Sequence, residues 1–139
     1  MIYADSSALI AWFHPRDKFS LQVVPWLRER GPELAWNLAL RLELRHHLRR
    51  VTSNYRETAW HAYRAAETTG RLLLDRASLA VLFEEADELS ARHHRTSCGS
   101  WDCLHVAAGL RSRVEWFATA DSHQATLARA AGLQVKLFS

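Results

Sequence analysis

Short apolar runs alternate with longer segments of helical spacing along the whole chain. Each apolar run is a few residues long, and it is followed by a stretch in which apolar residues recur every three or four positions. Runs too short for helices fit strands that are buried on both faces, and strands separated by helices pair in parallel. The sequence therefore predicts an α/β fold, a three-layer sandwich in which helices cover both faces of a five-stranded parallel sheet.

No repeat or low-complexity segment interrupts this alternation, and the 139 residues fit one domain, 1–139. Strands are expected at residues 2–4, 33–36, 71–74, 114–118 and 133–138. Helices are expected at residues 6–13, 18–30, 38–51, 55–68, 78–93, 101–111 and 122–131. In such a sheet, ligands bind beyond the carboxyl ends of the strands.

The composition argues against a membrane protein and against a disulfide scaffold. No apolar stretch is long enough to span a bilayer, and the N-terminus lacks the basic start of a signal peptide, so we expect a cytoplasmic protein. Cys98 and Cys103 are then expected as reduced, half-buried thiols. A zinc site combining them with His93, His94 and His105 is the alternative, but their spacing matches no common zinc motif.

Four of the 15 acidic residues stand where solvated charge is unusual. Asp5 and Asp121 each follow an expected strand. Asp102 lies in the first turn of a helix, and Glu43 borders the apolar stripe of another helix. Each has a structural explanation by itself, as a helix cap, a partner of the helix dipole or an edge residue paired with Arg or His. In a parallel sheet, however, Asp5, Asp102 and Asp121 are expected at the same edge, with Glu43 nearby.

Four carboxylates in one place repel one another unless a cation neutralises them. Two like charges about 4 Å apart repel by roughly 1 kcal/mol in water and about 4 kcal/mol at an effective dielectric near 20. Hard oxygen ligands favour Mg2+ or Mn2+ over zinc, and magnesium leaves room for a phosphate oxygen and a water. The sequence therefore indicates metal-dependent hydrolysis of a phosphodiester.

Arginines crowd one quarter of the chain, although the net charge of +3 is modest. Arginine donates in pairs to phosphate and stacks on bases, so Arg41, Arg45 and Arg49 are candidate RNA-binding residues. A solvated helix surface explains them equally well. The six tryptophans could stack on bases, but core packing or a protein interface is the preferred interpretation. Trp12 and Trp60 are the candidates for an interface.

Four segments resemble the acidic motifs of PIN domains, in order and spacing. They are Tyr-Ala-Asp5-Ser-Ser-Ala-Leu-Ile, Leu-Arg-Leu-Glu43-Leu-Arg-His-His-Leu, Trp-Asp102-Cys-Leu-His-Val-Ala-Ala and Phe-Ala-Thr119-Ala-Asp121. The length and the whole chain are similar to the small VapC-type toxins of bacterial toxin–antitoxin pairs. After Asp121 the chain continues Ser-His-Gln, without the further acidic residue of some relatives, which puts a second metal site in doubt.

This resemblance implies a Mg2+- or Mn2+-dependent endoribonuclease. Asp5, Glu43, Asp102 and Asp121 would be its catalytic and metal-binding residues, with Ser7 and Thr119 as supporting hydroxyls. It also implies an RNA substrate, a cognate antitoxin and a homodimer. The alternatives are a housekeeping PIN nuclease of RNA processing and a non-catalytic RNA-binding module of the same fold. A Mg2+-dependent phosphatase is disfavoured because no phosphate-cradling glycine loop is present.

Overall fold

The structure is a computed structural model that describes residues 1–31, 33–52 and 54–139. Within these residues a five-stranded parallel sheet has the strand order β3-β2-β1-β4-β5. The strands are β1 (Ile2–Ala4), β2 (Leu34–Trp36), β3 (Leu72–Leu74), β4 (Trp116–Thr119) and β5 (Val135–Leu137). The helices are α1 (Ser6–Phe13), α2 (Ser20–Arg30), α3 (Leu38–Arg49), α4 (Arg56–Thr68), α5 (Leu79–Arg92), α6 (Ser100–Arg111) and α7 (Ser122–Ala130).

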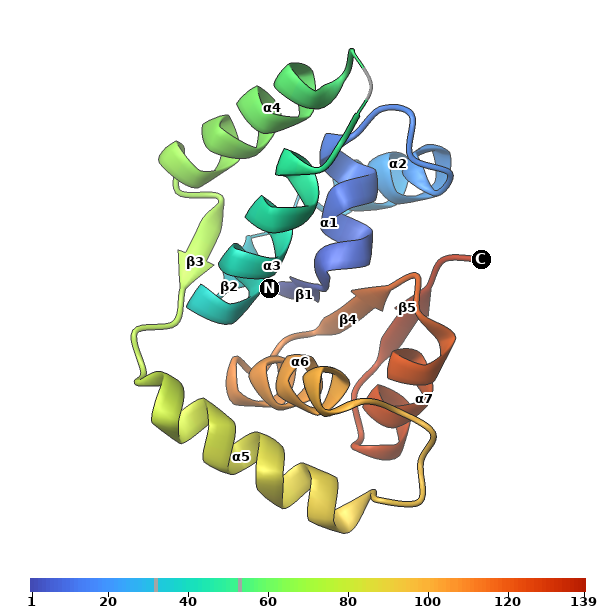
Figure 1. Ribbon diagram of the computed structural model, residues 1–139. Coiled ribbons are helices and arrows are strands. Elements are labelled where there is room, and N and C mark those ends of the chain that lie inside the picture. The colour runs from blue at the N-terminus through green and yellow to red at the C-terminus, as the bar shows by residue number, and fades with distance from the viewer. Residues whose placement is uncertain (32, 53) are drawn as a thin grey trace.

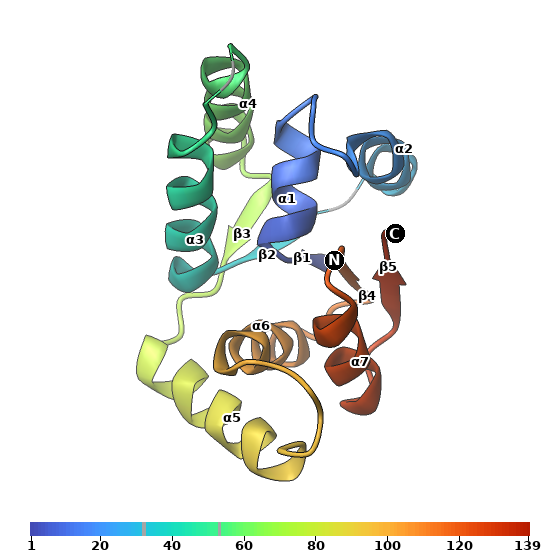
Figure 2. The same ribbon diagram turned by 45° about the vertical axis from the view of Figure 1, so that its right-hand side comes forward.

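The helices divide between the two faces of the sheet. Figure 1 shows α1, α2, α3 and α4 on one side and α5, α6 and α7 on the other, and the turned view in Figure 2 keeps this division. α5 packs chiefly against α6. The expected three-layer α/β sandwich is confirmed.

The winding of the chain reverses at β1, in the middle of the sheet. From β1 the chain proceeds outward to β2 and β3, then crosses back through α5 and α6 to β4 on the other side of β1. The helices that follow β1 and β4 therefore leave on opposite faces. In open parallel sheets this reversal point, at the carboxyl ends of the strands, is where ligands generally bind.

The ends of two strands differ from the expected ranges. β4 starts and ends later than residues 114–118, and β5 occupies only the middle of 133–138. The pairing explains both, because β4 pairs with β1 from Trp116 to Ala118 and with β5 from Phe117, opposite Val135, to Thr119, opposite Leu137. Sequence periodicity cannot show which residues of a short apolar run find a partner.

One apolar cluster includes buried residues from both sides of the sheet. Tyr63 of α4 and Phe117 of β4 are among its fully buried side chains. Across the residues that the structure describes, none of the helices has the length and apolar character needed to cross a bilayer.

Candidate active site

Asp5 leaves the end of β1 and is buried, with only 3% of its surface exposed. Its Oδ1 accepts hydrogen bonds from the Ser7 hydroxyl at 2.6 Å and from the Ala8 backbone N–H at 2.9 Å, so it caps α1. Its Oδ2 accepts from the Thr119 hydroxyl at 2.7 Å. Burial raises the pKa of Asp5, although the hydrogen bond from Ser7 and the nearby His105 oppose the rise.

Ser7 and Thr119 connect the end of β1 to the end of β4. The Thr119 hydroxyl, which donates to Asp5, also accepts from the backbone N–H of Asp121 at 2.9 Å. The Ser7 hydroxyl accepts from the backbone N–H of Ala120 at 2.9 Å. Both hydroxyls therefore fix the loop that carries Asp121 relative to Asp5.

Asp121 and Asp102 are joined through Gln124 of α7. Oδ1 of Asp121 caps α7 by accepting from the backbone N–H groups of His123 at 2.8 Å and Gln124 at 3.2 Å. The side-chain amide of Gln124 donates to Oδ1 of Asp102 at 3.0 Å, while Oδ2 of Asp102 accepts from the Gly99 backbone N–H at 2.7 Å. Gln124 is therefore the direct link between these two carboxylates.

Glu43 lies on α3, and three side-chain donors hold its carboxylate. Oε1 accepts from the Ser6 hydroxyl at 2.5 Å, and Oε2 accepts from the indole N–H of Trp101 at 2.6 Å. Nε2 of the buried His105 lies 2.7 Å from the same Oε2. Burial favours a higher pKa for Glu43, but His105, Ser6 and Trp101 outweigh it and lower the pKa to about 2.

His105 is itself held by the tyrosine of β1. The hydroxyl of Tyr3 lies 2.7 Å from Nδ1 of His105, and the side-chain amide of Asn37 donates to that hydroxyl at 3.3 Å. His105 is buried and engaged at both ring nitrogens, by Tyr3 and by Glu43. The chain from Asn37 through Tyr3 and His105 connects α3, β1 and α6 to the carboxylate of Glu43.

Asp5, Asp121 and Asp102 are thus connected at one edge of the sheet through Thr119 and Gln124. Glu43 has no hydrogen-bond partner in common with them among the described residues, and its partners Ser6 and Trp101 are the sequence neighbours of Asp5 and Asp102. The structural roles of the four acidic residues are also real, since Asp5 and Asp121 cap helices, Asp102 lies in the first turn of α6 and Glu43 pairs with His105. Among the residues that the structure describes, no group of three or more His, Cys, Asp or Glu side chains is placed to hold a metal ion. The convergence is therefore less tight than the four motifs predicted.

The donors still fit a hard cation by their chemistry. Asp5, Asp102 and Asp121 offer carboxylate oxygens, which suit Mg2+ and Mn2+. Oε1 of Gln124, between Asp102 and Asp121, is buried and has no hydrogen-bond partner among the described residues. A buried acceptor without a donor is costly in an apolar interior. This atom leaves room for one further polar contact beside the two carboxylates.

The zinc alternative finds no support in the geometry. Among the described residues, the two cysteines and the three histidines form no group placed to hold a metal ion. Burial raises the pKa of Cys98 to about 11, with Cys103 beside it as a further cause. His105 is already engaged by Tyr3 and Glu43.

The structure separates the three candidate RNA-binding arginines. Arg41 and Arg45 form ion pairs with Glu67 of α4 at 3.1 and 2.9 Å, and Arg64 pairs with the same carboxylate. Arg49 is exposed and forms no ion pair within the described part of the chain. Among the described residues, Arg49 is therefore the one of the three without an ion pair.

Three residues that contact the acidic side chains were not predicted from the sequence. Ser6 and Trp101 bind Glu43, and Gln124 binds Asp102. Ser6 and Trp101 stand next to Asp5 and Asp102 in the sequence, which was the available signal. Nothing in the sequence around Gln124 indicates that it reaches α6.

Comparisons with known proteins place this chain in a family. Its fold is similar to that of the sarcin–ricin-loop-cleaving toxin VapC20 of Mycobacterium tuberculosis, with a TM-score of 0.73, 19% identity and 96% of each chain covered. It is also similar to FitAcB from Neisseria gonorrhoeae, with a TM-score of 0.64, 17% identity and coverage of 97% of this chain and 96% of that one. A search of curated proteins gave no significant match. The model of the PIN domain family matches residues 2–131, and the chain therefore belongs to the PIN domain family.

Proposed function

We propose that this chain is a metal-dependent endoribonuclease and the toxin of a VapBC-type toxin–antitoxin pair. The observation that carries the proposal is the hydrogen-bonded connection of Asp5, Asp121 and Asp102 through Thr119 and Gln124. It lies where the chain reverses its winding at the carboxyl ends of β1 and β4, the usual ligand position in such sheets. A structural relative, VapC20, is described as a toxin that cleaves the sarcin–ricin loop.

Asp5, Asp102 and Asp121 would hold the divalent cation, with Glu43 as the fourth acidic residue. The bound cation supplies positive charge that polarises the phosphate, eases deprotonation of water and offsets charge on the leaving oxygen. Ser7 orients the Asp5 carboxylate by its hydrogen bond. Glu43, with a pKa near 2, stays ionised at neutral pH and attracts cations instead of delivering a proton.

RNA cleavage in the presence and absence of Mg2+ or Mn2+ tests the activity. We expect cleavage by the wild-type protein only with a divalent ion, and a loss of at least about 100-fold in Asp102→Asn, because metal affinity and activity depend on every ligand. Asp87→Asn, an exposed carboxylate on α5, is the matched control and should cleave normally. Cleavage that persists in EDTA, or that Asp102→Asn leaves intact, contradicts the proposal.

The toxin assignment needs a test in cells. Expression of the wild-type chain should arrest growth, and Asp5→Asn should abolish the arrest. Cleavage without arrest favours the housekeeping PIN nuclease, which is the second candidate. RNA binding without cleavage, in any divalent ion, favours the non-catalytic module.

A cognate antitoxin requires a surface to cover, and the early helices offer one. A cavity of about 510 Å3 beside α1 and α2 is lined by apolar side chains that include Trp12, Leu21 and Pro25. Leu21 is 90% exposed and shares this apolar lining with Trp12 and Pro25, and contiguous exposed apolar patches mark sites of protein contact. We propose that the antitoxin binds here. Co-expression with Leu21→Asp should leave RNA cleavage intact and weaken inhibition by the antitoxin.

We also propose a homodimer, and sedimentation of the purified chain tests it. Exposed apolar side chains on β3 and α5 are candidates for a contact with a second copy. Leu74 and Phe83 are 47% and 50% exposed. A monomeric mass at micromolar concentration contradicts this part of the proposal.

A further inference from the structure

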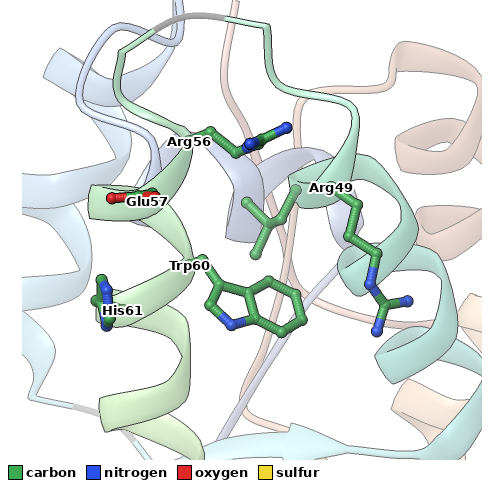
Figure 3. A pocket seen from close by; sticks show the side chains of 6 residues that line it. Arg49, Arg56, Glu57, Trp60 and His61 are labelled. Atoms are coloured by element: carbon green, nitrogen blue, oxygen red, sulfur yellow. The ribbon is translucent and has the colours of Figure 1, made fainter.

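A cavity of about 460 Å3 lies between α3 and α4, apart from the acidic residues. Its lining consists of Leu48, Arg49, Arg56, Glu57, Trp60 and His61. Figure 3 shows Arg49 extending from α3 and Trp60 from α4 beside it, with Arg56 at the start of α4. The volume is within the range of small-molecule sites, about 300–1,000 Å3. No residue of the proposed catalytic centre lines this cavity.

The charge of the cavity is net positive because two arginines and one glutamate line it among the described residues. Neither Arg49 nor Arg56 forms an ion pair within residues 1–31, 33–52 and 54–139, whereas Arg41 and Arg45 of the same region are paired with Glu67. Glu57 is the only acidic residue in the lining. Unpaired guanidinium groups are suited to phosphate, which they bind with two parallel hydrogen bonds.

Trp60 adds an aromatic surface to this positive cavity. It is half-buried, packs edge-on against Tyr63 at a ring-centroid distance of 5.4 Å, and carries the guanidinium of Arg49 at 5.2 Å from its own centroid. Aromatic and guanidinium planes together are the surfaces on which single-stranded bases stack. An acidic peptide could form ion pairs with the arginines but has no base to stack on Trp60.

We infer that this cavity binds one nucleotide of the RNA, with the phosphate at Arg49 and the base against Trp60, while Arg56 adds positive charge at the start of α4. The inference rests on the proposed ribonuclease function and extends it to a second contact with the substrate. It also changes the assignment of Trp60, for which core packing or a protein interface was expected.

The cavity and the acidic residues share α3, and this sets the relation between them. Arg49 follows Glu43 by six residues, about 9 Å along the helix axis, and projects from the other flank of the helix. An RNA that reaches both must cross the outer face of α3, where Leu42 and His46 are exposed. The nucleotide in the cavity therefore contacts the protein away from the cleaved bond, and loss of this contact should raise KM and leave kcat unchanged.

Binding of a short, unstructured, fluorescent single-stranded RNA to the Asp5→Asn protein tests the inference without cleavage. We expect Arg49→Gln to weaken binding about 5–10-fold and to lower the salt dependence by about 0.7, the value for one phosphate contact in a single strand. Trp60→Leu should weaken binding by a similar factor through lost stacking. Arg50→Gln removes the same charge from the adjacent residue, which does not line the cavity, and should change affinity less than about 2-fold.

Several results would overturn the inference. Equal losses in Arg49→Gln and Arg50→Gln would mean that only the general charge of α3 matters. Loss of affinity for a glutamate-rich peptide in Arg49→Gln, with RNA binding unchanged, would make the cavity a peptide site. If Trp60→Leu unfolds, two other variants replace it: Trp60→His, which keeps a ring for stacking, and Trp60→Val, which does not. They are compared under conditions in which their melting temperatures are equal. Equal RNA affinity of the two variants contradicts stacking on Trp60.

The cleavage assay separates this inference from the proposed function. If the wild-type protein cleaves RNA and Arg49→Gln has an unchanged KM, the nuclease proposal is supported and the inference about the cavity is contradicted. If the wild-type protein never cleaves RNA, but its RNA binding depends on Arg49 and not on Arg50, the inference about the cavity is supported and the nuclease proposal is contradicted.

Discussion

At the scale of single residues, the proposed centre places function and stability in opposition. Asp5 is a carboxylate with nearly all of its surface removed from water, and its charge is stabilised by hydrogen bonds from Ser7, Ala8 and Thr119 and by the nearby His105. Burial still raises its pKa, so the charge is costly, and proteins retain such groups where activity requires them. The same side chain should therefore be necessary for activity and costly for the fold without a cation.

Asp5→Asn is expected to stabilise the protein in EDTA by about 1 kcal/mol, a rise of roughly 3 °C in Tm. The amide removes the buried charge, its oxygen can still accept from Ser7 and Ala8, and the Thr119 hydroxyl has a second lone pair to accept from the new N–H. Thermal unfolding measures the shift, with the exposed Asp87→Asn as the control. An unchanged or lower Tm at neutral pH contradicts the expected cost of the charge.

The difference in Tm between Asp5→Asn and the wild type should become smaller as the pH is lowered. Because burial raises the pKa of Asp5, the folded protein binds this proton more tightly than the unfolded chain. The contribution of the protonated Asp5 carboxyl to the stability of the wild type is present in full below the pKa that Asp5 has in the unfolded chain. This contribution is lost as the pH rises through the higher pKa that Asp5 has in the folded protein. The gap in Tm should therefore be widest at neutral pH and close on acidification, and a gap that widens on acidification contradicts this reasoning.

Gln124 is a positioning residue whose replacement should affect metal binding more than folding. In Gln124→Leu the buried volume is kept and the unpartnered Oε1 is removed, so stability should change by less than about 1 kcal/mol. Asp102 loses its donor from α7, and the affinity for Mn2+ should fall about 10–100-fold, as for other residues that orient metal ligands. Calorimetric titration with Mn2+ measures this, with Gln22→Leu on α2 as the control. Normal Mn2+ affinity in Gln124→Leu contradicts the assigned role.

At the scale of elements, α6 carries Asp102 and His105 and lies very close to β4. A Cβ added at Gly109 of α6 would lie 3.0 Å from Cδ2 of Phe117 and 3.4 Å from Cδ1 of Leu133. The small residue thus allows the helix to approach the strand. That approach also determines how far Asp102 lies from Asp5 and Asp121.

Gly109→Ala should therefore destabilise the protein by about 1–3 kcal/mol through overpacking, despite the better helix propensity of alanine. Urea unfolding measures the loss. In the double variant with Phe117→Leu, the total loss should be smaller than the sum of the single losses, because the smaller side chain makes room for the methyl group. Additive losses would show that the close contact is not the cause.

At the scale of the whole molecule, β1 joins the two halves of the sheet. It pairs with β2 on one side and β4 on the other, and Tyr3 stacks on Phe117 of β4 with centroids 5.3 Å apart. The apolar cluster includes residues from both halves. Neither half keeps a complete core without the other.

We therefore expect a single domain that unfolds in one cooperative transition. Urea curves followed by tryptophan fluorescence and by far-UV circular dichroism should have the same midpoint, and Tyr3→Ala should shift both curves equally. Two separate midpoints in the wild-type protein would show that the halves unfold independently.

The sequence by itself determined the fold class and the strand ends that carry Asp5 and Asp121. Alternating short apolar runs and helical patterns have few other solutions, and a charged residue after a buried strand must lie at the edge of the sheet. The exact limits of β4 and β5 could not be predicted from the sequence, because they depend on which residues find partners in the neighbouring strands.

Only the tertiary structure decided which polar groups meet. The ion pairs of Arg41 and Arg45 with Glu67, the contact of Gln124 with Asp102 and the unpaired state of Arg49 within the described residues all depend on helices far apart in the sequence. Hydrogen bonds and ion pairs act over a few ångströms, so they follow from the packing of the helices, whereas the hydrophobic pattern that makes each helix is already present in its own residues.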